Sequence, residues 1–180
     1  MLKKILAVVV VLVVVLLVVV ATRPARYRVE RSLVIVESPR VLFDAVADLR
    51  KWEHWSPWAK LDPAQKTTFT DTPSLVGSSY AWAGNDKVGE GRMTVTEIHP
   101  PLQVKIKLEF LAPWKDTSQT IFDLYVESGG TRVVWIMQGE RDFMGKAMSL
   151  FMDMDKVIGP DFERGLANLK TGAEDATIPR

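Results

Sequence analysis

The stretch "KAMSLFMDMDKVIGPDFERGLANLK", Lys146 to Lys170, decides the fold because its large apolar residues recur at helical spacing. At about 100° per residue they share one sector of a helix, which is typical of a face that packs on a core. We therefore predict one long helix from Asp142 to about Thr171, kinked or split at Pro160, because proline lacks the backbone donor. The sector comprises Met144, Met148, Phe151, Ile158, Phe162, Leu166 and Leu169.

Two aspartates interrupt this apolar stripe. Asp155 falls inside the sector, whereas Asp153 points away from it and is expected to face solvent. An ionised carboxylate on a core-facing position is costly unless it is paired or faces water. For Asp155 we favour a structural ion pair with Arg or Lys on the sheet or a neighbouring helix, then contact with the polar end of a ligand, then catalysis.

The region before this helix predicts an antiparallel sheet. The run "YRVERSLVIVES" alternates like a strand, and Ser38 followed by Pro39 begins a helix, with a short second helix after it. Short runs rich in β-branched residues follow, separated by Gly and Pro turns, with no helix between them. We predict one α+β domain over residues 27–172 and a flexible tail over 173–180.

The N-terminus carries the strongest signal in the sequence. Lys3 and Lys4 precede an uninterrupted apolar run from Ile5 to Ala21, which would span about 25 Å as a helix, enough to cross a bilayer. The run exceeds the apolar part of a usual signal peptide. We therefore predict a transmembrane anchor over residues 1–22, with an export signal as the alternative, and a short linker over 23–26.

The orientation in the membrane depends on which flanking charges dominate. Lys3 and Lys4 resemble the cytoplasmic end of an export signal. This favours a single-pass protein whose domain lies on the extracytoplasmic side of the inner membrane. The four arginines from Arg23 to Arg31 favour the opposite orientation.

The composition excludes several classes of function. The 180 residues carry 23 Lys and Arg against 22 Asp and Glu, a net charge of +1, which gives no electrostatic case for binding nucleic acid. The chain has no cysteine, so disulfides, thiolate metal sites and thiol nucleophiles are excluded.

Few side chains could carry catalysis. His54 and His99 are the two histidines, and we expect His99 to be exposed and His54 to be structural or exposed. No nucleophile motif is present. The segment "DMDKVIGPDFER" departs from a calcium loop at Val157, Ile158 and Arg164. We therefore predict no catalytic residue, no metal site and no cofactor.

The order of these elements resembles the helix-grip fold of the START-like (SRPBCC) superfamily. The segments "WEHWSPW", "GEGRMTVTEIHPP", "GGTRVVWIMQGE" and Lys146–Lys170 resemble its bacterial polyketide cyclase/dehydrase-like proteins, and the resemblance covers Tyr27 to Lys170. It implies a curved antiparallel sheet of about seven strands that wraps the long C-terminal helix, with two short helices between the first two strands. In this superfamily an apolar cavity between sheet and helix holds lipids, sterols or polyketides.

The resemblance, combined with strand alternation, gives a set of candidate cavity residues. Alternation identifies the side chains that share one sheet face, and the helical sector supplies the opposite wall. The candidate ligand-binding residues are Trp82, Ile106, Leu108, Phe122, Leu124, Trp135, Met137, Phe151, Asp155, Ile158 and Phe162.

These observations leave three hypotheses for the function. The first is a membrane-tethered, non-catalytic binding protein for a hydrophobic small molecule or lipid. The second is a polyketide cyclase or dehydratase-like enzyme, in which Asp155, His54, Tyr80 or Tyr125 could act only if burial shifted its pKa. The third is an envelope interaction module without a ligand. The expected partners are thus an apolar molecule and the membrane, with no nucleic acid.

Overall fold

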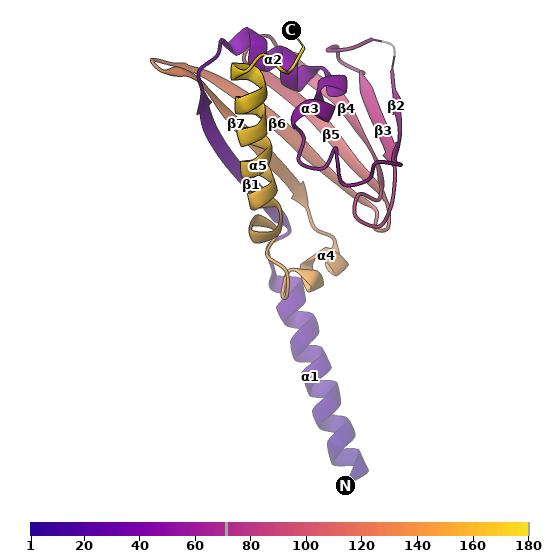
Figure 1. The fold of residues 1–180 in the computed structure, drawn as a ribbon. Helices are drawn as coiled ribbons and strands as arrows, with labels where there is room; N and C mark the ends of the chain where they lie inside the picture. The colour runs from indigo at the N-terminus through magenta and orange to yellow at the C-terminus, as the bar shows by residue number, and fades with distance from the viewer. Residues whose placement is uncertain (71, 180) are drawn as a thin grey trace.

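Helix α1, Leu2–Thr22, projects away from a seven-stranded antiparallel sheet that carries helices on one face (Figure 1). The computed structural model describes residues 1–70 and 72–179. Val20 is the one buried residue of α1. With a mean hydropathy of 3.6 and 21 residues, this helix is long and apolar enough to cross a membrane. A signal sequence at the N-terminus would have the same properties, so the anchor stays a prediction.

The sheet has the order β1-β7-β6-β5-β4-β3-β2, and every neighbouring pair is antiparallel. Strands β2 to β7 follow one another as a meander, and β1 adds to the free edge of β7. This confirms the predicted α+β architecture. The strands are β1 (Arg26–Ile35), β2 (Lys66–Phe69), β3 (Ser79–Ala83), β4 (Glu90–His99), β5 (Gln103–Ala112), β6 (Asp116–Glu127) and β7 (Gly130–Glu140).

Two short helices lie between β1 and β2, as predicted. Helix α2 spans Pro39–Ala47, and the Oγ of Ser38 accepts a hydrogen bond from the backbone N–H of Val41 at its start. A single 3-10 turn, Leu49–Lys51, connects it to α3, Trp52–Trp55. Helix α2 places aliphatic and aromatic side chains in the core, and α3 adds Trp52 and Trp55.

The C-terminal segment forms two helices, so the prediction of one helix over Asp142–Thr171 is wrong. Helix α4 spans Phe143–Met148 and helix α5 spans Met154–Glu174, with the break over 149–153. Pro160 lies inside α5 and does not divide the segment. The break has a local cause: the side chain of Asp153 accepts a hydrogen bond from the N–H of Asp155 at 3.1 Å and caps the start of α5.

The two helices have different surroundings. Helix α5 packs on β1, β7 and α3 and buries Phe162, Leu166 and Leu169. Helix α4 has no buried residue and lies beside the end of α1 (Figure 1). Against the expectation of a flexible tail from residue 173, Ile178 is 6% exposed and packs over Gly172; residue 180 lies outside the described residues.

Candidate functional site

The inner face of the sheet, which carries α3 and α5, is the candidate site. Strand register confirms that the predicted sheet residues share this face, since Phe122 lies opposite Trp135 and Met93 lies opposite both Tyr80 and Leu108. Their surroundings differ along the sheet. The inner face therefore has two regions, one filled and one half-covered.

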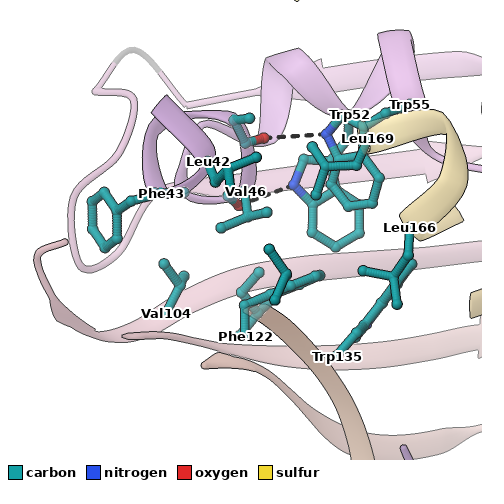
Figure 2. Close-up of a cluster of buried hydrophobic side chains, with 14 of the residues drawn as sticks. Leu42, Phe43, Val46, Trp52, Trp55, Val104, Phe122, Trp135, Leu166 and Leu169 are labelled. Atoms are coloured by element: carbon teal, nitrogen blue, oxygen red, sulfur yellow. Dashed lines mark hydrogen bonds between the residues drawn. The ribbon is translucent and has the colours of Figure 1, made fainter. Parts of the chain in front are cut away.

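The filled region is the aromatic core cluster, formed by Trp52, Trp55, Phe122, Trp135 and Phe162. Figure 2 shows the first four of these side chains packed together. Each of these side chains is at most 5% exposed. The rings of Trp135 and Phe162 stack with centroids 4.0 Å apart and planes at 8°. The indole N–H groups of Trp52 and Trp55 donate to backbone carbonyls of α2 at 3.0 and 3.2 Å. This arrangement is typical of a packed protein core.

Several predicted cavity residues belong to this packed region. Ile106, Phe122, Leu124, Trp135, Met137 and Phe162 are all between 0 and 5% exposed. The Nε1 atom of Trp135 is buried without a hydrogen-bond partner among the described residues. Such an unpaired donor costs about 1–3 kcal/mol, so this indole is the least satisfied group of the cluster.

The half-covered region is the β3-side strip, formed by Tyr80, Trp82, Leu108 and Phe110, each of which is half-buried. The rings of Tyr80 and Trp82 stack with centroids 5.6 Å apart, and Phe110 meets Trp82 edge to face at 6.1 Å. Gly91 makes room for the Trp82 ring, because a Cβ atom at residue 91 would lie 2.4 Å from that ring. The strip is thus a continuous apolar surface on β3 and β5.

The strip is half-buried because α5 packs on the β1 and β7 part of this face, away from β3. Helix α5 packs chiefly on β1, and none of the described helices covers the α1 end of β3 (Figure 1). Gln65, in the connection that leads from α3 to β2, donates a hydrogen bond to the Tyr80 hydroxyl at 2.7 Å. Trp82 and Leu108 were predicted from the sequence, but Tyr80 and Phe110 were not assigned to the ligand site, although strand alternation places them on the same face.

Asp155 forms the ion pair that we favoured from the sequence. Its two carboxylate oxygens accept hydrogen bonds from Arg31 of β1 at 2.8 and 3.0 Å, and Glu163 accepts one from the same guanidinium at 2.6 Å. The hydrogen bond from Arg31 holds the pKa of Asp155 below its ordinary value. Gly159 leaves space for the guanidinium, since a Cβ atom there would lie 2.1 Å from it. The pair therefore joins α5 to β1.

The other predicted residues of the helix have separate positions. Ile158 is half-buried on α5 and packs against the core. Phe151 lies between α4 and α5 and is 92% exposed, so its predicted place on the inner face is wrong. The physical reason is the cap at Asp153, which starts a new helix and takes Phe151 out of the helical sector.

A broad open trough of about 780 Å³ lies on the outer face of the sheet and is lined by none of the predicted residues. A polar chain of hydrogen bonds crosses it: Arg28 donates to Gln138 at 3.1 Å, and Gln138 donates to Gln119 at 3.0 Å. This trough is a polar surface and does not correspond to the apolar cavity that the resemblance implies.

The titratable groups of the inner face lie apart. Burial raises the pKa of Tyr27 and of Tyr80, but β1 and β3 are five strand spacings apart, about 24 Å along the sheet. These two groups therefore do not form an acid–base pair. His99 is exposed and lies 2.6 Å from Glu97. Among the described residues, no group of three His, Cys, Asp or Glu side chains could hold a metal ion.

Comparison with known proteins identifies the fold. No family model matches the chain, and no curated protein matches it. The Aha1 dimer of Colwellia psychrerythraea is 17% identical, with a TM-score of 0.59 over 82% of this chain and 96% of that protein. An uncharacterised protein of Rhizobium leguminosarum is 16% identical, with a TM-score of 0.61 over 83% of this chain and 95% of that protein.

The protein Mll3558 of Rhizobium loti is also similar, with 22% identity and a TM-score of 0.58 over 82% of this chain and 95% of that protein. At these identities the likeness defines the class of fold alone. The chain has the helix-grip-like α+β fold found in Aha1-like proteins, as the predicted superfamily resemblance implied.

Proposed function

We propose that this protein is a membrane-tethered binding protein for an apolar small molecule or lipid, which it holds on the β3-side strip. The half-covered state of the strip carries the proposal. Stacked aromatic and aliphatic side chains share one face there and are half-buried, because α5 packs chiefly on β1, and apolar surfaces of this kind mark binding sites. In the aromatic core cluster, by contrast, each side chain is at most 5% exposed.

Two further features support this proposal. The START-like proteins that the sequence resembles hold apolar ligands between sheet and helix, and the strip occupies that face. Helix α1 is apolar and exposed apart from Val20, which suits a membrane anchor. The separation of Tyr27 from Tyr80 favours binding over the cyclase hypothesis, because acid–base catalysis requires groups that converge on one substrate.

Mass spectrometry of lipids retained by the full chain tests this function. The chain is purified in detergent as the wild type and as two matched variants, Leu108→Asp in the strip and Leu102→Asp in the exposed turn before β5. A carboxylate on the half-buried inner face disfavours an apolar ligand, so Leu108→Asp should lower its retention by about tenfold. Leu102→Asp should retain the wild-type amount.

The matched design separates a specific ligand from lipid around α1, because annular lipid is retained equally by all three chains. Circular dichroism of each chain establishes that the fold is intact. Equal retention by Leu108→Asp and Leu102→Asp would reject the strip as the binding site.

A further inference from the structure

The exposed phenylalanine, tryptophan and methionine side chains gather at one end of the domain, whereas the exposed Tyr125 lies near the β6–β7 turn at the other end. Among the described residues after α1, every exposed Phe, Trp and Met lies at the end of the sheet from which α1 leaves. Phe151 is 92% exposed, Trp114 74% and Met144 65%. We name this surface the end patch; it consists of Trp114, Phe143, Met144, Met148, Phe151 and Met152.

Strand register and helix contacts place these residues at the same end. Trp114 lies in the turn between β5 and β6, and Asp116, the first residue of β6, pairs with Phe110. The other five residues lie in α4 or in the break that follows it, and α4 contacts α1 (Figure 1). The ammonium group of Lys146 in α4 lies 3.5 Å from the carbonyl oxygen of Ala21, in the last turn of α1.

We propose that the end patch inserts into the interface of the bilayer that α1 crosses. The inference rests on the anchor in the proposed function. The patch continues the exposed apolar surface of α1 with Phe, Trp and Met side chains, and a lipid surface accepts such side chains at the boundary of headgroups and acyl chains. Helix α4 thus acts as an interfacial helix beside the transmembrane helix α1. This explains why α4 buries no residue in the protein.

This contact specifies the class of ligand. Trp82 and Phe110 of the β3-side strip lie next to the ends of β3 and β5, at the same end of the sheet as the patch. A domain held down by α4 therefore presents the open end of the strip to the membrane surface. The molecule that binds the strip is accordingly a lipid that enters from the bilayer.

Depth-dependent quenching of single probes tests the membrane contact. The native chain has no cysteine, so one introduced cysteine gives one labelled position. The full chain is reconstituted in phosphatidylcholine vesicles as Phe151→Cys, Phe143→Cys, Val126→Cys or Leu12→Cys, each labelled with an environment-sensitive fluorophore. Val126 is 70% exposed near the turn that joins β6 to β7, at the opposite end of the sheet, and Leu12 is 63% exposed in the middle of α1.

The proposal requires a particular order of quenching. Probes at Phe151 and Phe143 should lose most of their fluorescence to a nitroxide placed high on the lipid acyl chain. The probe at Leu12 should be quenched best by a nitroxide deep in the bilayer, and the probe at Val126 by neither. The contact is overturned if the Phe151 probe is as accessible to water as the Val126 probe. It is also overturned if the Phe151 probe is shielded from water but is not quenched by the lipid nitroxides, and this second result would indicate a protein partner.

The outcomes separate this inference from the proposed function. Absence of deep quenching at Leu12 overturns the anchor and the end patch together. Shallow quenching at Phe151 with no retention difference between Leu108→Asp and Leu102→Asp rejects the apolar ligand and leaves the membrane contact supported.

Discussion

The aromatic core cluster and the β3-side strip lie on the same sheet face and are both rich in aromatic rings, yet they are packed differently. In the cluster, α3 and α5 close over the sheet and leave Trp135 1% exposed. In the strip, Trp82 stays half-buried beside Tyr80, because α5 packs chiefly on β1. The comparison shows that one apolar face can be fully packed in one part and only half-covered in another.

The largest expected effect is the loss of Trp135. Trp135→Ala leaves a cavity in a packed core and should lower the free energy of unfolding by about 3–5 kcal/mol. Trp82→Ala removes a half-buried ring and should cost about 1–2 kcal/mol. Urea unfolding of the full chain in detergent, followed by near-ultraviolet circular dichroism, measures both. Equal losses in the free energy of unfolding would contradict the difference in packing between the two regions.

A smaller effect tests how rigid the cluster is. A Cβ atom at Gly165 of α5 would lie 2.6 Å from the ring of Trp135, so Gly165→Ala forces that ring to move. Overpacking costs about 1–3 kcal/mol, whereas alanine in a helix gains about 1 kcal/mol over glycine. We expect urea unfolding to show a net loss of stability. A net gain would show that the side chains of the cluster move to make room for the added Cβ atom.

Gly129 is the control for this substitution. It lies in the turn between β6 and β7, and a Cβ atom there meets no atom within 4 Å. Gly129→Ala should change the free energy of unfolding by less than about 0.5 kcal/mol.

The smallest effect belongs to the ion pair of Asp155, at the exposed start of α5. Its pKa in the folded state is lowered by the hydrogen bond from Arg31. Its contribution to stability is therefore present above the pKa of the unfolded chain, about 3.9, and is lost as pH falls through the lower folded value. Asp155→Asn should be less stable than the wild type at neutral pH, and the difference should disappear in acid.

Thermal unfolding at a series of pH values measures this difference. Asp86→Asn, in the exposed turn between β3 and β4, is the matched control and should follow the wild type at every pH. A difference between Asp155→Asn and the wild type that persists unchanged in acid would contradict the assignment to Asp155.

The sequence was sufficient for the sheet, the two short helices and the ion pair, because alternation, caps and helical spacing are local signals. It was insufficient for the break between α4 and α5. The apolar sector continues through Met148 and Phe151, and a helical wheel does not show that Asp153 caps a new helix. Trp82 and Trp135 likewise share one face by alternation, but their different burial depends on where α5 lies, which is a tertiary property.

The connection between α1 and β1 sets the distance at which this protein can act. Three residues separate Thr22 from Arg26, and so short a segment reaches about 10 Å at most. On the proposed anchor, the domain would move with the membrane in two dimensions and could not extend toward a distant partner. Whatever binds it would have to diffuse in the same bilayer or arrive at its surface, so encounter rates would follow density per unit of membrane area and not concentration in solution.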